Sequence, residues 1–409
     1  MRVVMLAGLV AGLTSAGLTF AGLASAGLTF AGLTSAGLAQ TVAFDPQNTA
    51  VSPDMQVLLP HVGGRVRAQA LGADKPAGAM SYSHQWPAIY FETAFEGDRL
   101  LLKFHDPVNE YRLLIDDLAP IVIAQPGATE ITVSDLADGL HHVRLEKVTE
   151  SIWLLGAFEG FYGDPTARPA SAAAKARQIE FIGDSDMTGY GLRSLTTTCT
   201  QEEVRLTSDS QAAYPALVAR HFAADYQINA ISGRGIVRNF DGMVPDHTMF
   251  AIYKSILPDQ TDTATPYVNQ DWQPQIIVLG LGNNDFFSPL KPGEPWLNHD
   301  ALIDTYIVGM VEFLKTLQSV SADATVMIYW PDRGILTKAE AARRDRDGQS
   351  QLIKTAQRLG MKPLQFIAMG DLQLEMTACD AHASAKDHRK RASWLIDRIN
   401  LLPDLWSGQ

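Results

Sequence analysis

Hydrophobic and polar residues alternate in short runs through the first part of the chain. Five runs have the period of two that is typical of half-buried strands, and turn residues such as Glu96-Gly97-Asp98 separate them. The predicted strands are Ala88–Phe95, Arg99–His105, Tyr111–Asp117, Thr129–Ser134 and His141–Val148. Because no helix-length periodic segment lies between them, the pattern predicts an antiparallel β-sandwich of the jelly-roll type over residues 40–162.

The pattern changes after residues 163–177, a Pro- and Ala-rich stretch that is predicted to be a linker. Nearly continuous apolar runs then alternate with helical segments. The predicted strands are Gln178–Gly183, Tyr226–Ile231, Gln275–Gly282, Thr325–Trp330 and Leu364–Met369. The predicted helices are Ala212–Ala224, Ala301–Leu317, Lys338–Leu359 and Lys386–Leu402. This alternation predicts a parallel sheet with helices on both faces, a three-layer α/β/α domain over residues 178–409.

The first 39 residues carry one charge, Arg2, and an apolar tandem repeat that ends in Gly37-Leu38-Ala39. Small residues at both ends of that tripeptide are typical of a signal-peptidase site. We therefore expect a secretory signal peptide over residues 1–39 and a secreted or periplasmic mature protein. The competing interpretation is a transmembrane anchor with Gly-rich packing faces, but Gly, Ser and Thr dilute its hydrophobicity. We expect no membrane association after removal of the signal.

The net charge limits the possible binding partners, and the cysteine content bears on the expected disulfide of an exported protein. The formal net charge is −12, which argues against a nucleic-acid partner because phosphate binding needs clustered Lys and Arg. The two cysteines, Cys199 and Cys379, are an even count in a protein expected to be exported, so we expect a disulfide between them. Two buried free thiols are the alternative.

Residues with catalytic potential follow four of the predicted strands, at the edge where open α/β sheets carry their active sites. These stretches are Gly183-Asp184-Ser185, Ser232–Gly235, Gly282–Asp285 and Cys379–His382. They offer a hydroxyl, a glycine turn with N–H groups, a side-chain amide and an imidazole, which are the groups that acyl transfer requires. Each stretch alone is an ordinary turn or helix cap. Their occurrence in order at one sheet edge is what indicates a hydrolase.

Four motifs resemble those of a known family. They are GDSxxxGYG from Gly183, SGRGxxRN from Ser232, GxND from Gly282 and DxH ending at His382. Together they resemble the SGNH (GDSL) hydrolases. With a sandwich domain in front, the chain most resembles carbohydrate esterase family 2, over Trp86–Leu402.

The resemblance implies specific roles for these residues. Ser185 is the expected nucleophile and His382 its base. The Ser185 N–H, the Gly233 N–H and the Asn284 side-chain amide are the expected oxyanion hole. The implied activity is removal of acetyl groups from plant-wall polysaccharides or their oligosaccharides, of the xylan or glucomannan type, typically at sugar O-6. No metal and no other cofactor is expected.

Three positions depart from the family pattern. Asp186 follows the serine where a small or apolar residue is usual, and a carboxylate there would oppose an anionic transition state. We therefore expect Asp186 to point away from the site or to pair with an Arg. Asn283 stands where Thr is common. Ala381 replaces a frequent Trp, which removes one platform for a sugar ring.

The group that holds the histidine is a separate question. The wider superfamily has an Asp three residues before the His, but Cys379 occupies that position here. The nearest acid is Asp380, and residues two apart point the same way in an extended segment. We therefore predict a triad in which Asp380 orients His382. The alternatives are a Ser–His dyad oriented by a backbone carbonyl, or an Asp380 that merely caps a turn.

Two other functions fit the same sequence. One is a carbohydrate-binding protein with an inactive hydrolase domain, which the intact Ser185, Asn284 and His382 disfavour. The other is a general short-chain acyl esterase or thioesterase.

Overall fold

The structure, a computed structural model, describes residues 30–31, 41–45, 51–151, 153–259, 266–330, 332, 334–368, 372–402 and 405–406. Most of the predicted signal peptide, residues 1–39, lies outside the described residues. Two of its residues are described, Phe30–Ala31; they form β1, which pairs antiparallel with β2 (Thr41–Asp45). No helix among the described residues is long and apolar enough to cross a membrane.

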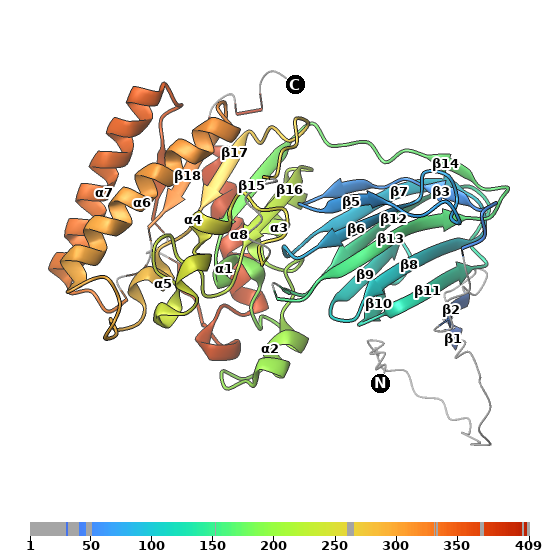
Figure 1. Cartoon of the computed structure of the whole chain (residues 1–409), viewed down its shortest axis with the longest axis horizontal. Coiled ribbons are helices and arrows are strands. Elements are labelled where there is room, and N and C mark those ends of the chain that lie inside the picture. Colours follow the sequence, from blue (N-terminus) through green and yellow to red (C-terminus); the bar gives the residue numbers. More distant parts are fainter. Residues whose placement is uncertain are drawn as a thin grey trace.

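Two antiparallel sheets form the N-terminal part of the molecule (Figure 1). The first contains, in spatial order, β1, β2, β11 (Gly127–Ser134), β8 (Leu100–Asp106), β13 (Gly156–Gly163), β6 (Met80–His84) and β5 (Arg67–Ala70), with β3 (Gln56–Leu58) paired to β13. The second contains β10 (Ile121–Ala124), β9 (Glu110–Ile115), β12 (Leu140–Lys147), β7 (Tyr90–Glu96) and β14 (Arg168–Ala170), with β4 (His61–Gly63) paired to β7. Buried side chains such as Phe91 and Phe104 pack in one core cluster. The predicted sandwich is confirmed.

All five predicted sandwich strands are present as β7, β8, β9, β11 and β12. Sequence reasoning did not find β13, whose sequence GAFEGFYG lacks strict alternation because it is buried along nearly its whole length. It also did not find β14, which lies inside the predicted linker, residues 163–177, and pairs antiparallel with β7.

The C-terminal part contains a five-stranded parallel sheet in the order β16 (Asp225–Ala230), β15 (Gln178–Gly183), β17 (Ile276–Leu279), β18 (Thr325–Tyr329) and β19 (Gln365–Ile367). Its helices are α1 (Ser185–Thr188), α2 (Gln201–Thr207), α3 (Tyr214–His221), α4 (Met249–Ile252), α5 (Asn283–Phe286), α6 (His299–Val320), α7 (Lys338–Leu359) and α8 (Ala385–Asn400). Three short 3₁₀ turns are η1 (Phe240–Gly242), η2 (Pro245–His247) and η3 (Cys379–Ala381).

The alternation of side chains along β15 shows why this sheet has two covered faces. Ile179 and Phe181 pack in the cluster that contains α3 and α8. Ile182 packs in the cluster that contains α6 and α7, which lie side by side in Figure 1. The predicted three-layer α/β/α arrangement is therefore confirmed.

Buried polar contacts join the sandwich to the parallel sheet. Arg65, between β4 and β5, donates from Nη2 to Glu180 Oε1 in β15 at 3.0 Å. Tyr90 in β7 donates its hydroxyl to Asp225 Oδ1 at the start of β16 at 2.7 Å. Because all four side chains are nearly inaccessible to solvent, the two parts of the chain form a tightly packed interface.

Candidate active site

Ser185 is the first residue of α1, directly after β15. Asp184 is the N-cap of this helix: its backbone is extended, and its Oδ1 accepts the Asp186 N–H at 3.1 Å. The chain therefore turns sharply from strand to helix. This turn leaves Ser185 partly exposed at the carboxyl edge of the sheet, while Asp184 is buried.

Ser185 and His382 are in hydrogen-bond contact although 197 residues separate them. The distance from Ser185 Oγ to His382 Nε2 is 2.9 Å. The other ring nitrogen, Nδ1, lies 3.0 Å from the carbonyl oxygen of Cys379, which only accepts. Nδ1 therefore carries the proton in the neutral ring, and Nε2 is free to accept the proton of the serine hydroxyl.

The prediction that Asp380 orients His382 is wrong. Asp380 Oδ2 accepts the hydroxyl of Tyr190 at 2.8 Å, and the histidine Nδ1 is bound by the main chain of Cys379 instead. The prediction assumed an extended segment, but η3 is a turn in which Asp380 and Ala381 have φ of +51° and +56°. The left-handed turn carries the carboxylate away from the ring. The structure has the alternative arrangement, a Ser–His pair oriented by a backbone carbonyl.

Tyr190 covers one face of the histidine, a contact that sequence reasoning did not find. The two ring centroids are 4.3 Å apart, with 33° between the ring planes. Because its hydroxyl also binds Asp380, Tyr190 bridges the loop after α1 to the turn that holds His382. The only sequence signal was its position between two glycines in the GYG part of the first motif.

The three expected oxyanion donors come from three connections at the same sheet edge. Gly233, with φ of +77°, lies in the turn after β16, and Asn284 lies in α5 after β17. Neither the Gly233 N–H nor the Ser185 N–H has an acceptor within the part of the chain that the structure describes. Asn284 Nδ2 donates to Asp184 Oδ2 at 3.0 Å and to the Arg234 carbonyl at 2.9 Å. These bonds hold the amide at the sheet edge, beside the residue that precedes the serine.

Asp186 pairs with an arginine, as expected from the sequence. Arg391 Nη1 in α8 lies 2.8 Å from Asp186 Oδ1. Burial alone would raise the pKa of Asp186, but the attraction of the Arg391 guanidinium outweighs it, and the pKa lies below its usual value. Asp184 behaves differently: burial, together with the nearby charge of Asp186, raises its pKa well above the usual value. The carboxylate after the serine is therefore ionised and paired.

The loop of the second motif is fixed by a buried carboxylate. Asp285 accepts the main-chain N–H groups of Ile236, Val237 and Arg238 at 2.9 to 3.0 Å. Burial raises the pKa of Asp285 to about 6, although these three bonds oppose the rise. The Asp of the GxND motif thus holds the turn that carries Gly233.

The sandwich also contributes to the site, through Glu150, which sequence reasoning did not find. Glu150 lies between β12 and β13, and its two oxygens accept the N–H of Ser232 at 2.7 Å and its hydroxyl at 2.5 Å. The residue before Gly233 is therefore held by the other domain. Trp153, three residues on and 53% exposed, lies under the Arg234 guanidinium at 5.5 Å from the ring centroid.

Exposed aromatic side chains lie on the loops that follow β16 and β17. Phe240 and Phe287 have ring centroids 6.0 Å apart and are 37% and 63% exposed. Together with Trp153, which lies in the segment between β12 and β13, they offer apolar faces, although Ala381 provides none.

Cys199 and Cys379 form a disulfide, as predicted, with their Cα atoms 5.5 Å apart. The bond ties the segment before α2 to η3, the turn whose carbonyl binds His382. Gly191 packs against it: a Cβ at this position would lie 2.5 Å from the Cys379 Cβ, and its φ is +58°. This close approach explains the second glycine of GYG.

Among the described residues, one group has the spacing to hold a metal ion: His61, Glu92 and Asp225. It lies at the domain interface and not beside Ser185. Lys175 Nζ is 3.5 Å from Glu92 and 3.4 Å from Asp225, so an ammonium already neutralises these carboxylates. The group fits an ion-pair network better than a metal site.

The sandwich, the three-layer sheet and the serine–histidine pair at its carboxyl edge together define a carboxylic ester hydrolase. The model of the carbohydrate esterase 2 N-terminal family matches residues 75–172. An acetylxylan esterase / glucomannan deacetylase of Cellvibrio japonicus is 41% identical over 348 residues, which are 85% of this chain and 92% of that protein. The chain belongs to carbohydrate esterase family 2, and it is a carbohydrate esterase.

Solved structures agree with this assignment. A carbohydrate esterase described as having divergent catalytic and non-catalytic binding functions in its active site is 39% identical. It matches with a TM-score of 0.75 over 86% of this chain and 100% of that one. A family two carbohydrate esterase from Clostridium thermocellum, solved with cellohexaose, is 22% identical, with a TM-score of 0.65 over 83% of this chain and 98% of that one. The second likeness shows the shared fold.

Proposed function

We propose that this carbohydrate esterase removes O-acetyl groups from plant-wall polysaccharides and their oligosaccharides, of the xylan or glucomannan type, through an acetyl-enzyme on Ser185. The observation that carries the proposal is the 2.9 Å contact between Ser185 Oγ and His382 Nε2 at the exposed sheet edge. The name of the 41% identical relative, acetylxylan esterase / glucomannan deacetylase, supports the substrate class.

In the first half of the reaction, Ser185 Oγ attacks the acetyl carbonyl carbon as its proton moves to His382 Nε2. The carbonyl oxygen becomes an oxyanion, which accepts the N–H groups of Ser185 and Gly233. Both amide hydrogens of Asn284 are bonded, to Asp184 and to the Arg234 carbonyl, so Asn284 joins these donors by exchanging one of its two bonds for the oxyanion. The bond to the sugar oxygen then breaks, and His382 returns its proton to that oxygen. The products are the free sugar hydroxyl and an acetyl ester of Ser185.

In the second half, His382 takes a proton from a water molecule, whose oxygen attacks the acetyl ester. The same donors bind the second oxyanion. Collapse of this intermediate releases acetate and returns the proton to Ser185 Oγ. The Cys379 carbonyl binds the Nδ1–H throughout, so the ring keeps one tautomer and one orientation.

For glucomannan, whose hexose units carry a primary O-6, hydrolysis at that oxygen is the positional part of the proposal; the xylose units of xylan have no O-6, and their acetyl groups are removed from the ring oxygens O-2 and O-3. An O-6 acetyl group lies on a primary carbon outside the ring, where it extends toward a serine at a sheet edge with little hindrance. Digestion of acetylated glucomannan followed by proton NMR checks this part: the O-6 acetyl signals should disappear before those at O-2 and O-3. Equal loss at all positions would contradict it.

The main test uses variants of the pair. Ser185→Ala and His382→Ala should each lower acetate release from acetylated xylan by several orders of magnitude. The double variant should be little worse than either, because the residues act as one unit. Ser171→Ala and His105→Ala, at exposed positions on the linker and on β8, are matched controls that should keep full activity. Near-normal turnover by a folded Ser185→Ala variant would rule out the acetyl-enzyme.

The competing functions give different results in the same assay. A binding protein with an inactive hydrolase domain would bind acetylated xylan and release no acetate from it or from 4-nitrophenyl acetate. A general acyl esterase or thioesterase would hydrolyse butyryl esters or acyl thioesters better than acetylated polysaccharide. We expect the highest kcat/KM on the acetylated polysaccharides.

The substrate class requires export, which the predicted signal peptide over residues 1–39 would supply. Mass spectrometry of the protein recovered from the medium or periplasm should find Gln40 at or near the N-terminus. An intact N-terminus in a cell-associated product would contradict this.

A further inference from the structure

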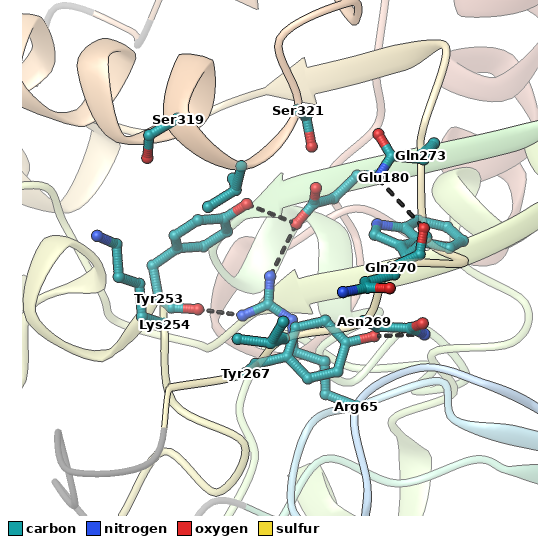
Figure 2. Close-up of a pocket in the computed structure, with 13 residues that line it drawn as sticks. Arg65, Glu180, Tyr253, Lys254, Tyr267, Asn269, Gln270, Gln273, Ser319 and Ser321 are labelled. Atoms are coloured by element: carbon teal, nitrogen blue, oxygen red, sulfur yellow. Dashed lines mark hydrogen bonds and ion pairs between the residues drawn. The ribbon is translucent and has the colours of Figure 1, made fainter.

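A pocket with a volume of about 300 Å³, shown in Figure 2, lies away from the candidate active site. Gln273 and Ser321 line it, and they lie just before β17 and β18, at the amino ends of these strands. Glu180 lines it from β15. Five residues of extended chain, at about 3.3 Å each, separate Glu180 from Ser185, so this pocket is distinct from the candidate active site.

The pocket contains a buried carboxylate that is only half satisfied. Glu180 is 1% exposed, and its Oε1 accepts three donors: Arg65 Nη2 at 3.0 Å, the Tyr253 hydroxyl at 2.9 Å and Asn229 Nδ2 at 2.5 Å. Figure 2 shows Arg65 and Tyr253 converging on this one oxygen. No described residue donates to the other oxygen, Oε2. Oε2 is not among the atoms that are sealed from solvent without a partner, so it is an acceptor that a ligand hydroxyl in the pocket can reach.

The charge of Glu180 is already neutralised by a rigidly held guanidinium. Arg65 is 3% exposed, and its Nε also donates to Gln227 Oε1 at 3.2 Å. Its guanidinium carbon lies 4.6 Å from the ring centroid of Tyr253 and 4.7 Å from that of Tyr267. The polar floor is therefore preorganised and has no net charge.

The walls of the pocket are mostly aromatic rings and planar amides, and one exposed cation, Lys254, also lines it. Tyr267 and Trp272 supply the rings, and Asn269, Gln270 and Gln273 supply the amides. The indole N–H of Trp272 is shielded from solvent and has no acceptor in the described part of the chain. The pocket thus contains a donor without an acceptor, the Trp272 N–H, and an acceptor without a donor, Glu180 Oε2.

These features select the chemistry of the ligand. The Glu180 carboxylate disfavours an anionic ligand, and the Arg65 guanidinium disfavours a cationic one. The polar atoms without hydrogen-bond partners disfavour an apolar ligand. A neutral polyol with apolar ring faces satisfies all three conditions, because its hydroxyls both donate and accept. We propose that this pocket is a non-catalytic binding site for a pyranose unit of a polysaccharide chain. The proposal rests on the pocket alone and does not depend on the acetyl-enzyme of Ser185.

Hydrogen–deuterium exchange of the full chain locates the binding. Xylohexaose, cellohexaose and mannohexaose, without acetyl groups, are the probes, at concentrations up to several times a dissociation constant of about 1 mM, the value typical of a dozen contacting atoms. At least one probe should slow exchange in the peptide that covers residues 266–273. Protection confined to the peptides around Ser185 and Ser232 would overturn the proposal, and so would no protection with any probe.

Variants at the rim of the pocket complete the test without disturbing the buried floor. Gln270→Ala and Trp272→Ala should each weaken binding at least tenfold, and Trp272→Phe should weaken it less, because it keeps the ring and loses only the N–H. Gln351→Ala, on the exposed side of α7, is the matched control. All four variants should hydrolyse 4-nitrophenyl acetate like the wild type.

Different experimental results would contradict the proposed reaction and the proposed binding site. Oligosaccharide protection of residues 266–273 in an enzyme without esterase activity would contradict only the proposed reaction. Full esterase activity with unchanged binding in Gln270→Ala and Trp272→Ala would overturn only the second site.

Discussion

The imidazole of His382 is held by a main-chain carbonyl and by the ring of Tyr190. A carbonyl fixes the tautomer as well as a carboxylate does, but it carries no full charge to stabilise the imidazolium. The ionised carboxylate closest in sequence to Ser185 is Asp186, whose pKa is lowered by Arg391 and, to a smaller extent, by His382. In this site, a neutral carbonyl orients His382, and a different residue, Asp186, carries the nearby negative charge.

Asp380→Asn should therefore leave kcat almost unchanged. The asparagine oxygen still accepts the Tyr190 hydroxyl, and no group on His382 loses its partner, so we expect less than about a threefold change. Steady-state kinetics on 4-nitrophenyl acetate and on acetylated xylan measure it. A hundredfold loss of kcat at unchanged KM would contradict the structure and restore the triad.

Asn284→Ala should lower kcat by about 10²–10³ with little change in KM, as expected for the loss of one oxyanion donor. The variant also leaves the Arg234 carbonyl and Asp184 without a donor, so thermal unfolding should be followed in parallel. Gln351→Ala, which removes an exposed amide on α7, is the control. If KM rose at constant kcat, Asn284 would be a contact to the bound sugar instead.

At the scale of elements, each connection that carries a candidate catalytic group is held by a second element. The Asp285 carboxylate at the start of α5 holds the loop after β16. The segment between β12 and β13 holds the same loop through Glu150. The disulfide holds η3. The loops that carry the candidate site are thereby fixed to the rest of the fold.

Glu150→Ala should lower kcat about tenfold while leaving the sandwich folded, because Ser232 loses both of its bonds to the sandwich and keeps only its contact with Thr188, so the Gly233 turn loosens. Glu150→Gln keeps one acceptor and should recover most of the activity. Asp138→Ala, which removes an exposed carboxylate in the turn before β12, serves as the control from the same domain. Equal activity in Glu150→Ala and the wild type would show that the sandwich does not support the site.

Removal of the disulfide should affect both stability and rate. The bond closes a loop of 180 residues, and loss of a native disulfide costs about 2–5 kcal/mol. The double variant Cys199→Ala, Cys379→Ala should unfold at lower temperature and have a lower kcat, because the Cys379 carbonyl that orients His382 is less constrained. Calorimetry and kinetics with and without reducing agent check this. An unchanged Tm in reducing agent would contradict it.

At the scale of the whole molecule, a charged network joins the two domains around Asp225. The carboxylate accepts the Tyr90 hydroxyl at 2.7 Å and the Lys175 N–H at 2.8 Å, and it lies 3.0 Å from His61 Nε2. Burial opposes ionisation, but these partners outweigh it and lower the pKa of Asp225 to about 2. The interface is therefore stabilised by an ionised Asp225.

This lowered pKa predicts loss of stability in acid. Because the folded pKa is about 2 and the usual value is 3.8, the contribution of Asp225 is complete above about pH 4 and is lost as the pH falls toward 2. Asp225→Asn should lower stability at pH 6 and flatten its decline between pH 4 and 2. Urea unfolding across this range measures both effects, with the exposed Asp117→Asn as the control. A parallel decline in wild type and Asp225→Asn would show that Asp225 carries no such linkage.

The sequence predicted the elements whose pattern is local. The alternating strands, the five buried strands and the long helices were predicted from periodicity. Ser185, Asn284 and His382 were predicted to lie together because each comes after a predicted strand of the parallel sheet. Short strands without a continuous apolar run, such as β3, β4 and β14, were not found, whereas β17 and β19 are as short but lie in apolar runs and were predicted.

The sequence by itself determined the class of fold, the family and the residues brought to one sheet edge, because periodicity and motif spacing are properties of neighbouring residues. It also indicated the disulfide, from an even count and an expected export. Only the tertiary structure decided what orients His382, because the left-handed turn at Asp380 and Ala381 is invisible in the residue types. Only the tertiary structure brought Glu150 and Arg65 of the sandwich to the parallel sheet. Such contacts join residues 82 and 115 positions apart, and no local pattern encodes them.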